Sequence, residues 1–85
     1  MSDPTRLEIR TKVAQAFQHM LKRPVDETEN VLRSTEPKWD SLFHVELVFI
    51  VEDACDVTFA PEQLETLVSL EAFVDAVLAQ RQAVA

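Results

Sequence analysis

The stretch that decides the fold is Trp39-Asp40-Ser41-Leu42-Phe43-His44-Val45-Glu46-Leu47-Val48-Phe49-Ile50-Val51-Glu52-Asp53. Asp and Ser are favoured at the start of a helix, because their side-chain oxygens accept hydrogen bonds from free backbone N–H groups. The sequence therefore predicts a helix that begins at Asp40 or Ser41 and runs to about Ala54. It is too apolar for an ordinary surface helix and too charged for one buried on all sides.

The apolar residues of this helix fall into two stripes on roughly opposite faces, at about 100° per residue. The first stripe is His44, Leu47, Val48, Val51 and Cys55, and the second is Leu42, Val45 and Phe49, flanked by Glu46, Glu52 and Asp53. Only one stripe can face the core of a small domain. The second stripe is either covered by a neighbouring loop or exposed within an acidic rim, as expected where a partner docks.

Apolar periodicity predicts two more long helices and a short one around the central helix. The first spans Pro4 to about Leu21, with Pro at a first helical position, and a short segment spans Pro61 to Thr66. Ser69 is the expected N-cap of the last helix, which runs to about Gln80. The predicted core residues of the two outer helices are Ile9, Val13, Ala16, Phe17, Met20, Leu21, Leu70, Phe73, Val74, Val77 and Leu78.

A long loop, residues 22–40, separates the first two helices and contains two prolines. Structureless connections longer than about 12–15 residues are uncommon in compact domains and are often functional. Val25, Val31 and Leu32 are its expected apolar anchors. The chain therefore reads as all-α, with three main helices, one short helix and a long first loop.

Size and composition indicate one small folded domain over residues 1–85. Apolar residues are 47% of the chain and charged residues 27%, which is typical of a globular protein. A domain of this size buries only about 60% of the surface of its unfolded chain. A deep enzyme cleft is therefore not expected, and we predict no catalytic residues and no enzyme activity.

The net charge of −7 disfavours nucleic acid and anionic lipid as partners and favours basic protein surfaces. No apolar run approaches the roughly 20 residues that span a bilayer, and the N-terminus lacks the features of a signal peptide. We therefore expect a cytoplasmic protein without membrane insertion, and a monomer. The single cysteine, Cys55, cannot form an internal disulfide and is expected to be a small buried hydrophobe.

The chain has no glycine, which removes the Gly-rich phosphate loop, the dinucleotide fingerprint and the nucleophile elbow. Its two histidines, His19 and His44, are far apart and have no further ligand at metal-binding spacing. No calcium-binding loop is present either. We expect no metal site.

The chain resembles acyl carrier proteins over about residues 5–80, and two segments carry the resemblance. Asp40-Ser41-Leu42, after a long loop and before Val45-Glu46-Leu47-Val48 and Glu52-Asp53, is similar to the attachment motif and recognition helix of that family. Val57-Thr58-Phe59-Ala60-Pro61-Glu62 and Leu67-Val68-Ser69-Leu70 are similar to its second loop, short third helix and entry to the last helix. The resemblance implies an acyl-carrier-like four-helix bundle.

The resemblance also implies a carrier and not a catalyst. In the family, 4′-phosphopantetheine esterifies the serine of the motif, here Ser41, and the thiol of this arm holds an acyl group as a thioester. Asp40 would assist the phosphopantetheinyl transferase that attaches the arm. The other implied partners are a loading ligase or transferase and a downstream synthase or acyltransferase. They would dock on Leu42, Val45, Glu46, Phe49, Glu52 and Asp53.

Departures from the common fatty-acid-synthesis pattern favour a stand-alone carrier of a specialised fatty-acyl or polyketide-type pathway. Pro37-Lys38-Trp39 stands where Gly and Ala are usual, and Phe43-His44 stands where an acidic residue is usual. Two alternatives remain open. One is an aminoacyl or peptidyl carrier loaded by an adenylating ligase, and the other is an acidic helical interaction module whose serine is never modified.

Three residues beside the motif have open roles. We expect His44 to be a packed structural histidine and Trp39 to anchor the loop, with contact to the arm as the alternative for Trp39. Phe43 belongs either to the helix edge or to the docking surface. Cargo is expected to lie partly between the second and last helices, in a bundle that is closed when unloaded.

Overall fold

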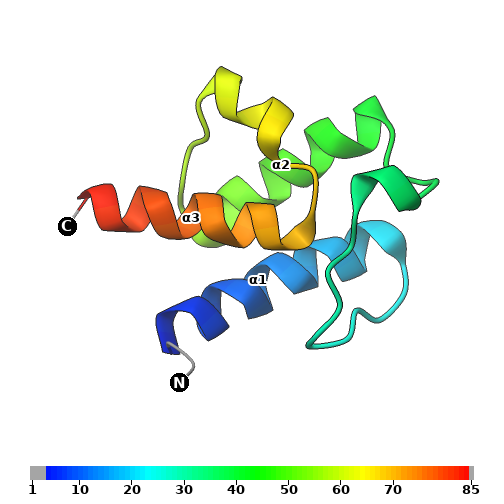
Figure 1. Ribbon diagram of the computed structural model, residues 1–85, viewed down its shortest axis with the longest axis horizontal. Helices are drawn as coiled ribbons and strands as arrows, with labels where there is room; N and C mark the ends of the chain where they lie inside the picture. Colours follow the sequence, from blue (N-terminus) through cyan, green and yellow to red (C-terminus); the bar gives the residue numbers. More distant parts are fainter. Residues whose placement is uncertain (1–3, 85) are drawn as a thin grey trace.

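The computed structural model describes residues 4–84, and every regular element in this range is a helix (Figure 1). Its elements are α1 (Pro4–Leu21), η1 (Arg33–Thr35), α2 (Ser41–Cys55), η2 (Pro61–Thr66) and α3 (Leu70–Val84), where η denotes a 3₁₀-helix. The predicted all-α class with three main helices and a short one is confirmed. The 3₁₀ turn η1 lies inside the expected loop, and α3 extends beyond the predicted end at about Gln80.

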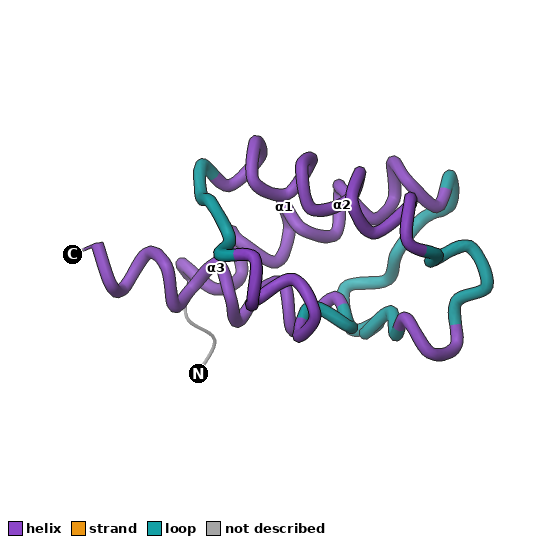
Figure 2. The backbone as a smooth tube through the Cα atoms, turned by 90° about the horizontal axis from the view of Figure 1, so that it is seen from above, coloured by secondary structure: helices purple, strands orange, loops and turns teal. Residues whose placement is uncertain are grey.

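The long helices are arranged so that α1 packs against both α2 and α3. Both views show α2 and α3 running in the opposite sense to α1 (Figures 1 and 2). The start of α2 lies at the same end of the molecule as the long loop, whereas the start of α1 and the end of α3 lie at the other end (Figures 1 and 2). The Ser41 end of α2 is thus separate from both ends of the described chain.

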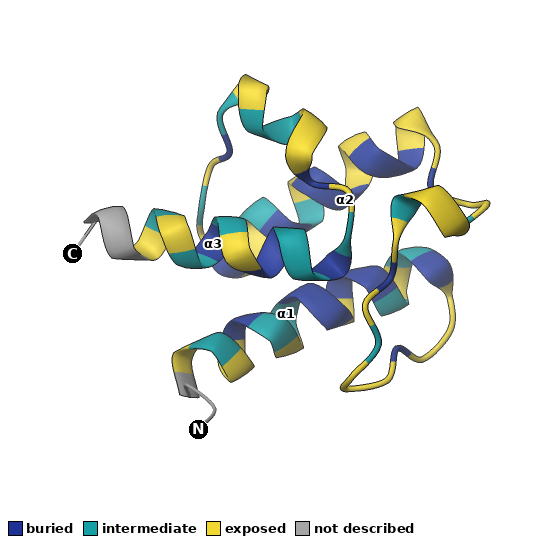
Figure 3. Ribbon diagram, viewed as in Figure 1, coloured by how far each residue is buried: buried dark blue, intermediate teal, exposed yellow. Residues whose placement is uncertain are grey.

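The core lies where the three long helices face one another, as the dark blue inner faces show (Figure 3). Of the predicted core residues of α1 and α3, only Met20 and Leu78 are partly rather than fully buried. Aromatic rings fill the centre: Phe17 makes edge contacts with Phe73, at 5.7 Å between ring centroids, and with Trp39, at 5.2 Å. Such pairs add stability beyond the area they bury.

The long loop is ordered by polar contacts with α1. The Arg10 guanidinium donates hydrogen bonds to the carbonyls of Asp26 and Glu29, and the Gln18 side chain accepts one from the N–H of Val25. These contacts satisfy backbone groups that regular secondary structure would otherwise pair. A structureless connection of this length is therefore compatible with a single fixed path.

One predicted anchor of this loop is wrong. Val25 and Val31 are buried, but Leu32 is 40% exposed. The backbone is extended here and forms an isolated antiparallel bridge between Leu32 and Ser69. Side chains alternate between the two sides of an extended chain, so the buried side chain of Val31 places that of Leu32 outward.

Candidate functional site

The N-terminus of α2 is capped by Asp40. This residue is extended, with φ −96° and ψ −170°, and its Oδ1 accepts a hydrogen bond of 2.9 Å from the N–H of Phe43. Its carbonyl accepts from the N–H of His44, also at 2.9 Å. Asp40 is therefore the N-cap residue, and Ser41 is the first helical residue.

Ser41 is left free by this arrangement. Its side chain is exposed, and its hydroxyl makes no hydrogen bond with any other residue in the range 4–84. The backbone N–H groups of Ser41 and Leu42 are likewise unpaired within that range. Free N–H groups at the positive end of a helix dipole favour an anion. The site therefore offers an accessible hydroxyl beside two free N–H groups that favour an anion.

The two apolar stripes of α2 have opposite environments. Every residue of the first stripe is buried, whereas Leu42 is 67%, Val45 is 49% and Phe49 is 64% exposed. No loop in the described part of the chain covers the second stripe, so the covering alternative is wrong. An apolar stripe at the surface thus begins directly beside Ser41.

The acidic rim of this stripe is uneven. Glu46 and Asp53 are exposed, and their side chains form no ion pair or hydrogen bond with other residues between 4 and 84. Glu52 is half-buried, and its Oε2 accepts a 2.8 Å hydrogen bond from the N–H of Phe59. Glu52 therefore also fixes the loop after α2, a role that the sequence pattern did not reveal.

Negative charge is concentrated in the part of the chain that contains α2 and η2. From Trp39 to Gln80 there is no Lys or Arg, and the acidic residues there are Asp40, Glu46, Glu52, Asp53, Asp56, Glu62, Glu65, Glu71 and Asp75. The last two face α1, where Glu71 and Asp75 pair with Arg6. The other seven have no basic partner among the described residues. This asymmetry is legible in the sequence, although net charge alone does not show it.

A shallow apolar groove of about 210 Å³ lies between α2 and η2. The residues that line it are His44, Val45, Val48, Phe49, Glu52, Phe59, Pro61 and Leu64. Val45 and Phe49 belong to both the groove and the exposed stripe, so the two form one continuous apolar surface.

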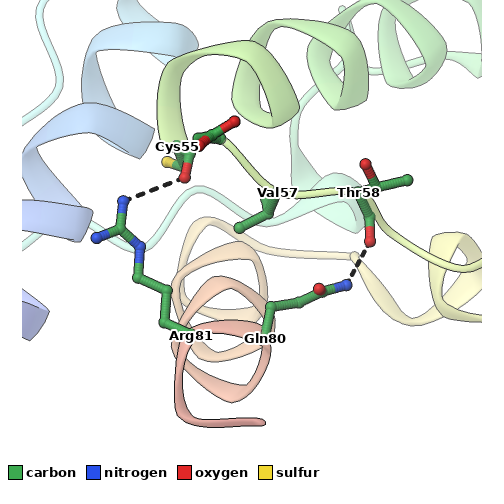
Figure 4. Close-up of a pocket in the computed structure, with 6 residues that line it drawn as sticks. Cys55, Val57, Thr58, Gln80 and Arg81 are labelled. Atoms are coloured by element: carbon green, nitrogen blue, oxygen red, sulfur yellow. Dashed lines mark hydrogen bonds between the residues drawn. The ribbon is translucent and has the colours of Figure 1, made fainter. Parts of the chain in front are cut away.

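A larger hollow, of about 530 Å³, lies at the opposite end of α2 (Figure 4). Two of its side chains join α3 to the end of α2 and the loop that follows it: Arg81 donates to the carbonyl of Cys55 at 3.1 Å, and Gln80 donates to that of Thr58. Since α2 rises by about 1.5 Å per residue, this hollow is roughly 20 Å from Ser41. Its contacts indicate a structural role.

The three aromatic residues around Ser41 are all buried. Trp39 anchors the loop against the core, as expected, with its indole ring tilted over those of Phe43 and Phe73. His44 is a packed histidine, also as expected. Phe43, which the sequence left open, belongs to the core and not to the exposed stripe. Cys55 is a buried hydrophobe, and burial raises the pKa of its thiol.

No cluster of three or more His, Cys, Asp or Glu side chains among residues 4–84 is placed to hold a metal ion. None of the helices that the structure describes is both long and apolar enough to cross a membrane. Comparison of the chain with protein families, with curated proteins and with solved structures finds no match. A functional assignment therefore rests on the residues and their geometry.

Proposed function

We propose that this chain is a stand-alone carrier protein of the acyl-carrier type, with 4′-phosphopantetheine attached to Ser41. The observation that carries the proposal is the free hydroxyl of Ser41. Because Asp40 makes the capping hydrogen bond, Ser41 has no structural duty in the described chain, yet it lies at a fixed and exposed helix start.

The geometry suits the attachment chemistry. In transfer from coenzyme A, the Ser41 oxygen bonds to the phosphorus of the phosphopantetheine group, and the bond from that phosphorus to the nucleotide breaks. Adenosine 3′,5′-bisphosphate leaves, and the hydroxyl proton passes to a base of the transferase. The product is a phosphodiester, whose negative charge suits the free N–H groups of Ser41 and Leu42.

Presentation of the cargo needs a surface that several enzymes recognise in turn. The stripe of Leu42, Val45 and Phe49 supplies an apolar seat, and Glu46 and Asp53 supply charges at its edge. Basic partner surfaces are steered toward such a patch. We infer that the transferase, the loading enzyme and the downstream synthase or acyltransferase dock here in turn.

Intact mass after incubation with coenzyme A and a phosphopantetheinyl transferase of broad specificity tests the attachment. The chain and a Ser34→Ala control should each gain one phosphopantetheinyl group, because Ser34 is an exposed serine outside the site. The Ser41→Ala variant should gain none. Any phosphopantetheine on that variant would remove the assignment of Ser41.

The same measurement separates the alternatives. An unchanged mass of the unaltered chain, under conditions in which a known carrier is modified, would favour an acidic module that binds basic proteins without modification. The exposed stripe gives that reading its own support, since the stripe does not depend on Ser41. If the arm is attached, the mass added on loading distinguishes an acyl from an aminoacyl cargo.

A further inference from the structure

A buried hydrogen-bonded chain joins three elements next to Ser41. The indole N–H of Trp39 donates to His44 Nδ1 at 3.0 Å, and His44 Nε2 lies 2.8 Å from the carbonyl oxygen of Leu64. Trp39 ends the long loop, His44 lies in the first turn of α2, and Leu64 lies in η2. Trp39 and His44 are both buried.

The geometry fixes the tautomer of His44. An indole N–H can only donate, so Nδ1 must accept and carries no proton. A carbonyl oxygen can only accept, so Nε2 carries the proton and donates it to Leu64. Both ring nitrogens are therefore used, in opposite senses, by groups on two different elements. Turning the ring over or moving either partner would leave a buried polar group unpaired.

Leu64, the hydrogen-bond partner of His44, belongs to a short helix that has no fully buried residue. Leu64 itself is partly buried and packs against the core. Beside the His44 bond, the preceding loop is held by the contact between Glu52 and Phe59. The apolar groove separates η2 from α2. A displacement of η2 from α2 would therefore act directly on the hydrogen bond between His44 and Leu64.

Trp39, the other hydrogen-bond partner of His44, belongs to the segment that holds Ser41. Trp39 directly precedes the capping residue, and the segment turns tightly there, since the N–H of Asp40 donates to the carbonyl of Lys38 at 3.0 Å. The Trp39 ring is packed between Phe17, Phe43 and Phe73. A change in its indole hydrogen bond therefore acts on the backbone that sets Asp40 and Ser41.

We propose that His44 is a positioning residue that couples η2 to the Asp40-Ser41 segment through Trp39. A displacement of η2 then changes how Ser41 is presented. The coupling itself is a property of the fold, whereas its consequence for transfer to Ser41 rests on the proposed function. Packing of the ring alone would not produce this coupling. A ring of the same volume without the two nitrogens would fill the same space but make neither hydrogen bond.

Hydrogen exchange of the Trp39 indole N–H, measured by NMR, tests the coupling. Leu64→Ala removes the apolar contact of η2 but keeps its carbonyl, and Glu65→Ala is a matched control at an exposed neighbour on the same element. Leu64→Ala should speed indole exchange by about 2- to 30-fold, the usual size of such couplings, and Glu65→Ala should leave it unchanged.

Two substitutions of His44 each remove one of its two hydrogen bonds. The side chain of His44→Asn reaches about as far as Nδ1, and that of His44→Gln about as far as Nε2, so the first keeps the Trp39 bond and the second keeps the Leu64 bond. In either background Leu64→Ala should add no further change. His44→Phe removes both bonds at similar volume and, if it folds, should behave the same way. Two results would overturn the proposal. One is that Leu64→Ala changes indole exchange equally in the His44 chain and in the His44 variants, and the other is that it does not change indole exchange in the His44 chain.

The same variants separate this inference from the proposed function. With coenzyme A and a transferase, Leu64→Ala should change the KM for transfer to Ser41 more in the His44 chain than in the His44→Asn or His44→Gln chains, where only the direct contact of the groove with the transferase is altered. If the unaltered chain is never modified, the proposed function fails, and indole exchange still decides on His44. If transfer occurs but indole exchange shows no coupling, only the inference about His44 fails.

Discussion

The two faces of α2 have similar apolar composition and opposite fates. On one face Leu47 and Val51 are completely buried, and on the other Leu42 and Phe49 are about two-thirds exposed. Periodicity alone cannot tell them apart. Neighbouring charges distinguish them, because Glu46 and Asp53 lie beside the exposed stripe. The buried stripe includes no Asp, Glu, Lys or Arg, and its histidine, His44, makes two hydrogen bonds within the core.

An apolar stripe that lies outside the core therefore needs an explanation of its own. Apolar residues scattered singly on a surface need no explanation, but a row that continues into a groove marks a contact site. The first face stabilises the fold, and the second is the recognition surface that we propose. Variants on the two faces should therefore separate stability from binding.

The largest effect is expected on the free energy of unfolding. Leu47→Ala removes a completely buried side chain and should cost about 2–5 kcal/mol. Phe49→Ala, on the opposite face of the same helix, should change it by at most about 0.5 kcal/mol. Urea denaturation followed by circular dichroism measures both. Comparable losses would show that the exposed stripe is packed in solution.

The second effect concerns the start of the helix. Asp40→Ala removes the capping acceptor of the Phe43 N–H and should cost about 0.5–2 kcal/mol. Ser41→Ala should change stability by no more than about 0.5 kcal/mol, because its hydroxyl has no partner within residues 4–84. The same denaturation assay measures both variants. A larger loss for Ser41→Ala than for Asp40→Ala would reverse the assignment of the cap.

Much of the fold could be predicted because local signals agree with one another. Pro4 and Pro61 mark helix starts, Ser69 caps α3 by accepting from the N–H of Ala72, and apolar spacing gives the buried faces. The helix-start position of Ser41 and the two apolar stripes of α2 follow from the same signals, and each depends on neighbours within a few residues. The exposure of the second stripe does not follow from them, because it depends on where the neighbouring loops lie.

What could not be predicted depends on contacts between distant residues. The outward position of Leu32 follows from a backbone bridge to Ser69, and the structural duty of Glu52 follows from a loop that folds back to it. The link from Trp39 through His44 to Leu64 joins residues up to 25 positions apart. No periodicity encodes such pairings.

A smaller effect is expected at the rim of the exposed face. Glu46→Lys combined with Asp53→Lys should lower kcat/KM for phosphopantetheine transfer by about 2- to 30-fold, since two exposed charge pairs contribute about 0.2–1 kcal/mol each. The loss should shrink as salt is added. Glu8→Lys with Glu27→Lys is the control, because it changes net charge equally at exposed positions outside α2. Equal losses in both pairs would indicate a long-range charge effect and not a local interface.

The smallest effect, confined to alkaline solution, concerns Cys55 at the end of the buried stripe. Burial raises the pKa of this thiol above its ordinary value of 9.0. Above that pH the unfolded chain loses the thiol proton while the folded chain still holds it, so the unfolded state binds fewer protons and stability falls as pH rises. The contribution of the protonated thiol to the free energy of unfolding is fully present below its ordinary pKa. It is lost as the pH rises through the pKa of the thiol in the folded state.

The matched control moves the only thiol from one face of α2 to the other. Cys55→Ala removes the alkaline decline that the thiol causes, and Phe49→Cys in that background places a thiol at an exposed position. The exposed thiol should react rapidly with a disulfide reagent, because its thiolate forms freely and is accessible, whereas Cys55 should react only as the chain unfolds. Equal reaction rates for the two thiols would mean that the faces of α2 exchange environments in solution, and the division between a folding face and a recognition face would not stand.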